Sequence, residues 1–425
     1  MSKLRILFTY LRFRHRRFSD RQKLEAYQQK KLKKHLAFVT EKSEFYRKYK
    51  GHRLKDFPII DKGIMMENFD TINTVGINKD EALEFAVNAE RTREFDDKLK
   101  NITVGLSSGT SHSRGAFLVE KTETEKWAGF VLAKFLSHGI LGKYRVAFFM
   151  RANSNLYQSV GSNNIRFDFY DIYADMDKNI EKLGKNGADI LVAQPSALLM
   201  IAAAIDKKKI DIHPETVISI AEVLEKEDEE RIKKSSGVSV IHQVYECTEG
   251  CLAATCKYGT LHLNEDIVFI EKEYVDEKRF IPIITDFERT SQPIIRYRLN
   301  DVLVEKKGKC PCGSSCTALE KIEGREDDIF IFHGDEKEVK IFPDFIRRCI
   351  LFAGNIRDYR IVQQADESII IYADVDEQMK EKITSEFKKL AEDDHFELPK
   401  IRFEKYIYDK NRKLKRVERT GDVKV

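Results

Sequence analysis

The sequence predicts an α/β protein with a large N-terminal domain and a small α+β domain at the C-terminus. Strand-like runs alternate with helical segments over residues 144–250, a pattern typical of β-sheets flanked by helices. The chain has 425 residues, and 42% of them are hydrophobic, which is enough for more than one buried core. After residue 328 the chain again mixes strands and helices on a smaller scale. We therefore expect domains at residues 1–327 and 328–425.

Basic residues dominate the N-terminal arm, residues 1–55. This arm carries 18 Lys and Arg against 4 Asp and Glu. Apolar side chains recur at helical spacing over residues 21–49, so we expect a basic amphipathic helix packed on the main body. The best candidates for contact with an anionic membrane or a nucleic acid are Arg12, Arg14, Arg16 and Arg17. We favour a solvated face for them, and no nucleic-acid partner is expected.

The elements that follow are predicted from local patterns. Residues 79–95 predict a helix, and residues 101–106 and 116–120 predict strands. Thr122 and Glu125 have the spacing of a capping box, which predicts the start of an amphipathic helix. Further strands are expected at residues 144–151, 189–196, 215–224 and 238–250, and short strands of a β-rich module at residues 256–303.

The sequence shows neither a membrane span nor a secretory signal. Its longest apolar runs fall far short of the roughly 18 residues that a spanning helix needs. The N-terminus lacks the apolar core and cleavage site of a signal peptide. A cytoplasmic location is therefore expected.

A loop rich in Ser, Thr and Gly joins the strands predicted at residues 101–106 and 116–120. Seven of the nine residues at 107–115 are Ser, Thr or Gly. Glycines let main-chain N–H groups approach an anion, hydroxyls add donors, and Arg114 adds positive charge, so a phosphate-binding hairpin fits better than a linker. A Walker motif is excluded because no Lys-Ser or Lys-Thr pair follows Gly115 and no helix begins at the loop.

Four further motifs follow this loop in a fixed order: IAEVL at 220–224, YECTEG at 245–250, IIRYRLND at 294–301 and IEGREDD at 322–328. With them the chain resembles the adenylate-forming superfamily of acyl-CoA ligases, aryl acid ligases and luciferases. The resemblance is greatest to its phenylacetate-CoA ligase and deazaflavin-coenzyme synthetase branch. It implies an N-terminal domain that binds ATP and the acyl substrate, and a mobile C-terminal domain that swings about a hinge at Asp328.

The resemblance assigns ATP to residues of these motifs. Tyr245 is expected to stack on adenine, with Ala221 and Glu222 on the opposite side. Asp301 is expected to bind the ribose hydroxyls with support from Arg325. The residues expected around the β- and γ-phosphates are Ser107, Ser108, Gly109, Thr110 and Ser111. Each residue singly also fits a structural role, such as a core aromatic ring or a turn.

The implied reaction is adenylation of a carboxylic acid with release of pyrophosphate. Thr248 is expected to bind the α-phosphate and Glu249 to hold Mg²⁺, a hard cation that prefers carboxylate oxygen. Arg114 stands where the family usually has a lysine. The family's catalytic lysine lies near the C-terminus, where NRKLKRVER at 411–419 matches it with Lys413. Lys415 and a merely solvated basic tail are the alternatives.

Six of the seven cysteines lie between residues 247 and 316, which in a cytosolic chain favours metal binding over disulfides. Three thiolates and an imidazole make a tetrahedral zinc site. Related ligases of this branch have a similar arrangement, so a structural Zn²⁺ site within a β module at about residues 250–320 is expected. Its ligands would be Cys256, His262, Cys310 and Cys312, with Cys316 as an alternative ligand and buried thiols without a metal as the alternative interpretation.

The family expectation for the substrate is a small carboxylic acid, aromatic or otherwise. These residues do not indicate which acceptor takes the acyl group. The alternatives are CoA, a carrier-protein thiol, an amine and a hydroxyl. Two other functions also remain: a basic, zinc-containing protein that binds nucleic acid or a membrane surface, and a pseudoenzyme that binds ATP without turnover.

Overall fold

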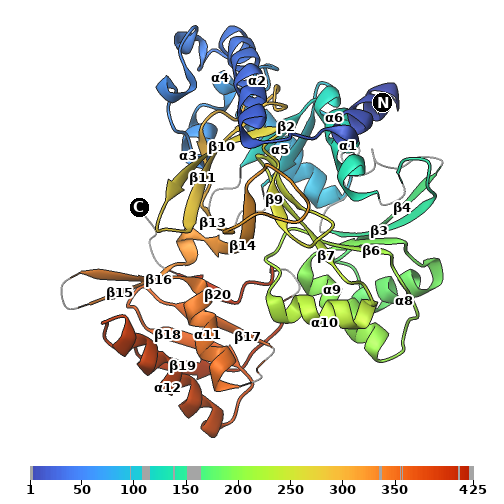
Figure 1. Ribbon diagram of the computed structural model, residues 1–425. Coiled ribbons are helices and arrows are strands. Elements are labelled where there is room, and N and C mark those ends of the chain that lie inside the picture. Colours follow the sequence, from blue (N-terminus) through green and yellow to red (C-terminus); the bar gives the residue numbers. More distant parts are fainter. Residues whose placement is uncertain are drawn as a thin grey trace. The chain divides into compact units, whose positions relative to one another are not determined.

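The computed structural model describes residues 3–95, 97–107, 115–136, 139–150, 164–334, 337–354, 356, 358–409 and 412–420 (Figure 1). The chain folds into two compact units. The first consists of Met1–Leu299 and Glu305–Glu320, and the second of Asn300–Val304 and Lys321–Val425. The sequence predicted a boundary at Asp328, which itself lies in the second unit. Among the described residues, no helix is both long and apolar enough to cross a bilayer.

A parallel block of strands forms the centre of the first unit. Its order is β4, β3, β5, β6, β7, with each neighbouring pair parallel. The strands are β3 (Tyr144–Met150), β4 (Ile165–Asp171), β5 (Ile190–Ala193), β6 (Thr216–Ser219) and β7 (Ile241–Cys247). Parallel strands connected through helices end at the same edge, so the chain segments that follow β5, β6 and β7 meet there.

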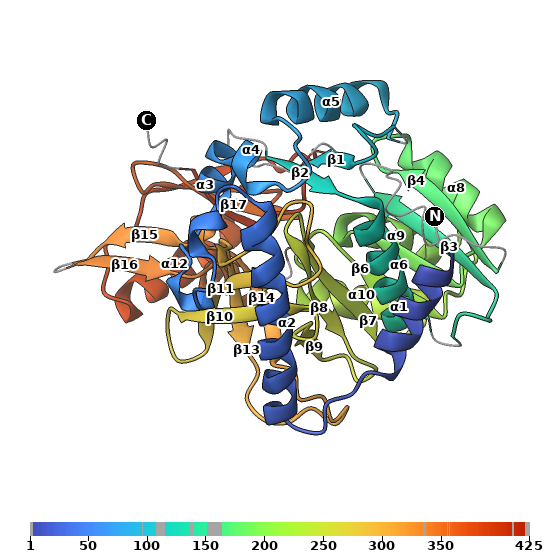
Figure 2. The same ribbon diagram turned by 90° about the horizontal axis from the view of Figure 1, so that it is seen from above.

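Helices cover both faces of this block. Phe149 packs with helices on one face, and its neighbour Phe148 packs with helices on the other, because successive strand residues point to opposite sides. The first face carries α8 (Met176–Asn186), α9 (Pro195–Asp206) and α10 (Lys226–Ser236). The second face carries α1 (Lys3–His15) and α6 (Lys121–Phe135) (Figure 2). The predicted α/β architecture is therefore confirmed.

The start of α6 differs from the prediction. The helix begins at Lys121, and its capping box consists of Glu120 and Glu123 rather than Thr122 and Glu125. The carboxylate of Glu123 accepts the main-chain N–H of Glu120 over 2.7 Å. Glutamate can replace the usual serine or threonine here because it too presents a side-chain oxygen to the orphan N–H groups of the first turn.

Antiparallel strands continue the first unit beyond β7. The strands are β8 (Gly250–Thr255), β9 (Leu261–Leu263), β10 (Val268–Tyr274), β11 (Arg279–Asp286), β12 (Tyr297–Arg298) and β14 (Ala318–Arg325). β7 pairs with β8, β8 with β9, and β9 with the first residues of β14. At the other end of the same sheet, β10 and β11 form a hairpin, and β11 also pairs with β12. The predicted β-rich module is present.

Helix α2 (Arg21–Lys42) of the basic N-terminal arm packs on this module as predicted. Its apolar face buries Leu24, Leu32 and Val39. On its polar side, Lys31 forms an ion pair with Glu288 at 2.8 Å. Part of the basic charge of the arm is therefore used inside the first unit.

Short helices lead from α2 to a small hairpin. They are α3 (Lys62–Glu67), α4 (Phe69–Ile72) and α5 (Lys79–Thr92), and the hairpin consists of β1 (Thr103–Leu106) and β2 (Ala116–Val119). α5 covers one face of the hairpin through an apolar cluster that includes Ala82, Ala86 and Leu118 (Figure 2). The predicted helix and both predicted strands are confirmed.

The second unit is a small α+β structure. Its sheet has the order β19, β18, β17, β20, and α11 and α12 pack on it around Ile361, Ile371 and Phe387. Its elements are β13 (Asp301–Glu305), β15 (Phe330–His333), β16 (Glu338–Ile341), α11 (Pro343–Ala353), β17 (Tyr359–Gln363), β18 (Ile369–Ala373), α12 (Glu377–Asp393), β19 (Ile401–Glu404) and β20 (Val417–Arg419).

Candidate active site

The hairpin of β1 and β2 carries the loop rich in Ser, Thr and Gly. Past the last strand pair, the N–H of Ser107 donates to the carbonyl of Gly115 over 2.7 Å, and the N–H of Gly115 donates to Ser107 Oγ over 2.9 Å. The loop therefore has a closed neck between two strands, as predicted. The other loop residues with a predicted role lie outside the described residues: Ser108, Gly109, Thr110, Ser111 and Arg114.

Helix α3 begins beside this neck. A Cβ atom placed on Gly115 would lie 3.2 Å from Cε of Lys62 and 3.5 Å from Sδ of Met66. The chain just before α3 is fixed in place because Ile60 pairs with Tyr297 of β12. Lys62 is thus a basic residue at the loop neck that the sequence did not predict, since it is 53 residues away from Gly115 along the chain.

The turn between β7 and β8 contains the next predicted residues, with Tyr245 in β7 and Thr248 and Glu249 after it. Arg289 connects this turn to the hairpin. One terminal nitrogen of Arg289 donates to the carbonyl of Thr248 over 3.3 Å, and the other donates to the carbonyl of Leu118 in β2 over 3.2 Å. Motifs more than 100 residues apart in the sequence therefore meet in one region of the first unit.

The carboxylate of Glu249 has a buried partner. Tyr297, which is 4% exposed, forms a side-chain hydrogen bond with Glu249. Burial and the charge of Glu249 both raise the pKa of Tyr297, so its hydroxyl stays protonated and donates. A donor on one side of a carboxylate orients it and leaves its remaining lone pairs for a cation. Apart from its place in the IIRYRLND motif, no sequence pattern pointed to this role of Tyr297.

Ala221 and Glu222 lie two and three residues after the end of β6, the strand next to β7. Ala221 has a φ of 66°, which is uncommon for a residue with a Cβ atom. Glu222 Oε2 accepts the main-chain N–H of Ser196 over 3.1 Å in the first turn of α9. Both residues lie at the predicted edge of the sheet, and Glu222 in addition caps a helix.

Two carboxyl groups lie close to the turn after β7, that of the half-buried Glu246 and that of the buried Asp286. The indole N–H of Trp127 donates to Glu246 over 2.8 Å, and burial nevertheless raises the pKa of Glu246 to about 7. Burial also raises the pKa of Asp286 to about 7. A Cβ atom on Gly250 would lie 2.6 Å from Oδ2 of Asp286, so this carboxyl group directly underlies the start of β8. Neither group was predicted from the sequence.

In the second unit, Asp301 is the first residue of β13 and Arg325 the last residue of β14. The N–H of Glu326 donates to the carbonyl of Asn300 over 2.6 Å, which joins the two segments next to these side chains. The predicted ribose-binding pair is therefore carried by adjacent segments of the second unit.

The two candidate lysines near the C-terminus differ in their surroundings. Lys415 Nζ lies 2.6 Å from Oδ1 of Asp328. Burial raises the pKa of Asp328, although the positive charge of Lys415 opposes that effect. Lys413 is half-buried and lies two residues before Lys415. Lys415 thus has an identified structural role, the neutralisation of a buried carboxylate.

The four residues predicted as metal ligands come together in the β module. One potential ligand atom from each of Cys256, His262, Cys310 and Cys312 lies within 4.8 Å of all the others. The sulfur atoms of Cys256 and Cys310 are 3.8 Å apart. This equals the spacing of roughly 3.8 Å that follows from tetrahedral zinc with Zn–S bonds of about 2.3 Å.

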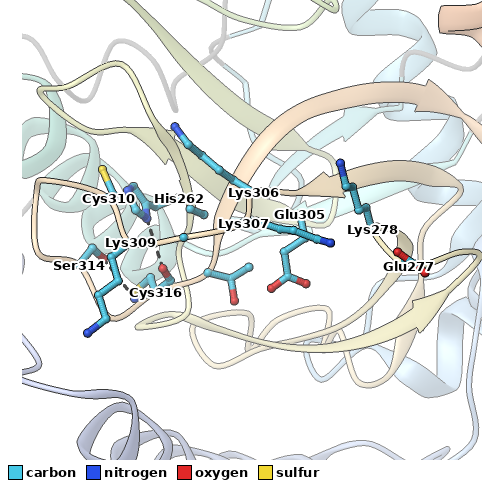
Figure 3. Close-up of a pocket in the computed structure, with 13 residues that line it drawn as sticks. His262, Glu277, Lys278, Glu305, Lys306, Lys307, Lys309, Cys310, Ser314 and Cys316 are labelled. Carbon is cyan, nitrogen blue, oxygen red and sulfur yellow. Dashed lines mark hydrogen bonds between the residues drawn. The ribbon is translucent and has the colours of Figure 1, made fainter.

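The imidazole of His262 is oriented for such a site. Its Nδ1 lies 3.3 Å from the carbonyl oxygen of Cys316, and its Nε2 lies 3.3 Å from Sγ of Cys312. Donation from Nδ1 to the carbonyl leaves the Nε2 lone pair facing the thiols. Cys316 therefore contributes its main chain to the cluster. Figure 3 shows His262 and Cys310 at one end of a pocket and Lys278 at the other.

Several solved structures are similar to this chain over most of its length. 2-Hydroxyisobutyryl-CoA ligase in its postadenylation state with 2-HIB-AMP has a TM-score of 0.69 at 15% identity, covering 95% of this chain and 90% of that chain. The GH3.15 acyl acid amido synthetase has a TM-score of 0.57 at 13% identity, covering 90% and 86%. The amide bond synthetase McbA from Marinactinospora thermotolerans has a TM-score of 0.54 at 13% identity, covering 74% and 68%.

The chain has the fold of the adenylate-forming ligases. No protein-family model matches the sequence, and no curated protein matches it. The fold class that the sequence motifs implied is confirmed. Because the identities are below 20%, the agreement concerns the backbone arrangement, and the roles of individual residues are inferred from this chain's own geometry.

The buried carboxyl group of Asp286 predicts a specific pH dependence of stability. Its pKa is about 7 in the folded protein and about 3.8 in the unfolded chain, so the folded state holds the proton more tightly between these values. The contribution of Asp286 to stability therefore falls as the pH rises through this window. Asn cannot ionise, so the variant Asp286→Asn does not lose this contribution. The free energy of unfolding of the variant minus that of the wild type should therefore increase by on the order of 3 kcal/mol when the pH is raised from about 4.5 to 7.5.

Denaturant unfolding at the two pH values measures this difference. Asp20→Asn is the matched control, because hydrogen bonding to the Lys23 N–H lowers the pKa of Asp20 and the carboxylate is ionised throughout the window. Parallel pH profiles for the wild type and Asp286→Asn would contradict the assignment.

Proposed function

We propose that this protein is an ATP-dependent ligase that adenylates a small carboxylic acid and releases pyrophosphate. The observation that carries the proposal is the meeting of the β1–β2 hairpin, which carries the Ser107–Gly115 loop, with the Thr248–Glu249 turn: Arg289 donates to Leu118 in the hairpin and to Thr248 in the turn. Solved ligases of this fold have been captured with acyl adenylates, 2-HIB-AMP in one and anthranoyl-AMP in another. The same fold, together with an acidic turn joined to the hairpin whose loop has a phosphate-binding type of sequence, supports the same first reaction here.

In the proposed reaction, a carboxylate oxygen of the substrate attacks the α-phosphorus of ATP. A P–O bond forms, the bond to the β-phosphate oxygen breaks, and pyrophosphate leaves with that electron pair. The chain's task is to position the reactants and to offset negative charge. We assign this task to the loop, including Arg114, to Thr248 at the α-phosphate and to Lys413, with Lys62 as an added cation at the loop neck.

Mg²⁺ would be held by Glu249 and would supply positive charge to the phosphate oxygens of ATP. Tyr297 holds this carboxylate through its hydrogen bond. For the nucleoside we assign adenine to Tyr245, Ala221 and Glu222, which lie at the ends of neighbouring parallel strands. Asp301 and Arg325 are assigned to the ribose.

We infer a thiol, with CoA as the first candidate, as the acceptor of the acyl group. Both 2-hydroxyisobutyryl-CoA ligase and anthranilate CoA ligase have this fold, and so do two amide-forming synthetases, so an amine is the second candidate. The phenylacetate-CoA ligase branch remains the closest resemblance in sequence motifs. Trp127 donates to Glu246, the residue after Tyr245 in β7, and these two are the polar groups that we assign to the acyl side of the site.

The central test is pyrophosphate release from ATP across a panel of aryl, fatty and amino acids. The wild type should release pyrophosphate with at least one class of acid. Lys413→Ala should lower that rate by about a hundredfold or more, because a cation at the transferred phosphate is lost. Lys415→Ala should keep the rate of the folded protein within a few-fold but lower the free energy of unfolding by about 3 kcal/mol, since Asp328 is left buried without its partner.

Lys405→Ala, an exposed lysine of the second unit, is the matched control for both measurements. If Lys415→Ala abolishes turnover while Lys413→Ala retains it, the catalytic assignment is wrong. ATP binding without pyrophosphate release for any acid would instead indicate a pseudoenzyme.

The hydrogen bond between Tyr297 and Glu249 makes a second prediction. Tyr297→Phe should raise the Mg²⁺ concentration needed for half-maximal pyrophosphate release by about tenfold, because the Glu249 carboxylate loses the group that orients it. Tyr274→Phe is a matched control, since its hydroxyl also donates to a glutamate, Glu305, over 2.7 Å. An equal Mg²⁺ dependence in the two variants would show that Tyr297 has no part in holding the cation.

We also propose that the cluster of Cys256, His262, Cys310 and Cys312 binds a structural zinc ion. Three sulfur ligands and one nitrogen ligand fill a tetrahedral coordination sphere, so no position is left for a reacting water. The cluster joins β8, β9 and the segment before β14, and zinc would stabilise this module by fixing these strands together.

Metal analysis of purified protein tests the zinc site. We expect stoichiometric zinc in the wild type and its loss from Cys310→Ser/Cys312→Ser, with a lower thermal midpoint because binding energy is folding energy. Cys316→Ser is the matched control and should keep its zinc, since Cys316 contributes only its carbonyl. Zinc retained in the double variant, or lost in Cys316→Ser, would refute this ligand set.

A further inference from the structure

The N-terminal helix α1 packs against the first unit with one face only. Tyr10 and Phe13 are buried in the same apolar cluster as Phe130 of α6. The two helices approach closely at Gly129, where a Cβ atom would lie 2.6 Å from the carbonyl oxygen of Ile6. This contact fixes the rotation of α1 about its axis. Figure 1 and Figure 2 show α1 beside α6.

The opposite face of α1 carries an exposed apolar stripe. Leu4 is 79% exposed, Leu7 38%, Phe8 69% and Leu11 45%. Their spacing of three, four and seven residues places them on one side of the helix, turned away from Tyr10 and Phe13. Single exposed leucines are ordinary on protein surfaces, but four large apolar side chains in a row on one helix face indicate a contact surface.

Basic residues flank this apolar stripe. Residues 1–19 contain six Lys and Arg and no Asp or Glu. At 100° per residue, Lys3 and Arg14 fall along one edge of the stripe and Arg5 and Arg12 along the other. All three arginines also make internal contacts: Arg5 pairs with Glu125 at 3.2 Å, Arg12 donates to the Tyr27 hydroxyl over 3.4 Å, and Arg14 donates to the Leu136 carbonyl over 3.1 Å. Arg12 and Arg14 keep their positive charge, because their partners are neutral oxygens.

We propose that α1 docks this protein on the surface of an anionic lipid bilayer. The stripe of Leu4, Leu7, Phe8 and Leu11 would lie at the boundary between headgroups and acyl chains, while the flanking cations remain among lipid phosphates. This inference does not rest on the proposed ligase activity. Part of the arginine cluster predicted from the sequence is used elsewhere: the guanidinium of Arg16 lies over the ring of Tyr27 at 4.9 Å and also donates to its hydroxyl.

The charges favour a bilayer over other occupants of the stripe. A second copy of this chain would bring the same cationic edges against each other, with no carboxylate in the helix to pair with them. A nucleic acid would satisfy the cations through its phosphates but would leave the four apolar side chains in water. An anionic bilayer satisfies both the charges and the apolar stripe.

Vesicle co-sedimentation of the full chain tests the proposal. Vesicles of phosphatidylcholine with roughly one-third phosphatidylglycerol should retain the protein, and vesicles of phosphatidylcholine alone should retain at least about tenfold less. Leu7→Ser/Phe8→Ser should lose at least about tenfold in binding, and so should the wild type at high salt, since the attraction is screened. Phe352→Ser is the matched control, because that exposed aromatic residue lies on α11 and should leave binding unchanged.

Circular dichroism and pyrophosphate release verify that the serine variants remain folded and, if the proposed function is correct, active. Equal binding of the wild type and Leu7→Ser/Phe8→Ser would overturn the proposal, as would binding to neither kind of vesicle. A change in oligomeric state on substitution, without vesicle binding, would assign the stripe to self-association. If neither kind of vesicle binds the protein, but immobilised RNA retains both the wild type and Leu7→Ser/Phe8→Ser, the cations would be assigned to a nucleic acid.

Discussion

Two-sided burial of the parallel strands is the constraint from which the arrangement of the first unit follows. Phe148 and Phe149 are neighbours in β3, yet each is buried under different helices. Each such side chain contributes about 1.5–3 kcal/mol when removed from water, which makes both helical layers necessary. The interiors of the central strands β5 and β6 are apolar, and polar groups follow at the strand ends. The carboxyl ends of β6 and β7 are where Glu222, Tyr245 and Glu249 lie.

A buried carboxylate connects the loop-bearing hairpin to this sheet edge. Glu123 accepts the N–H groups of Thr290 and Ser291 over 2.6 and 3.1 Å, besides that of Glu120. An unpaired charge in this position would be strongly destabilising, so the segment at residue 290 must follow the start of α6. Arg289 then reaches the turn after β7 and the end of β2 together. The geometry of the proposed phosphate site is thus determined by contacts that do not themselves touch substrate.

Similar residues perform different tasks according to their surroundings. Lys415 neutralises the buried Asp328, whereas Lys413, two residues away, is the one that we assign to the reaction. Near the N-terminus, Arg14 and Arg16 hold α1 and α2 in place through hydrogen bonds. The exposed apolar stripe of α1 has a different task, because it is the surface that we propose for contact with a bilayer. The proposed zinc cluster is independent of both, because its four residues lie within the β module, which a bound zinc ion would stabilise.

The sequence by itself determined the order of the elements and most of the chemistry-bearing motifs. Periodicity predicted the α/β alternation, a strand on each side of the Ser107–Gly115 loop, and helix α5, because helices and strands follow from local side-chain spacing. The clustering of the cysteines, together with the resemblance to related ligases, predicted the four residues that meet in the β module. The start of α6 was wrong by a few residues, because Glu120 served as a cap where Thr122 was expected.

Only the tertiary structure decided which side chains support these motifs. Lys62 beside Gly115, Tyr297 on Glu249 and Arg289 between the hairpin and the turn join residues far apart in the chain, and no local pattern records such contacts. The same holds for α1, whose sequence is apolar on two sides. Contact with α6 at Gly129 selected the face to be buried, and the helix geometry then left Leu4, Leu7, Phe8 and Leu11 in the solvent.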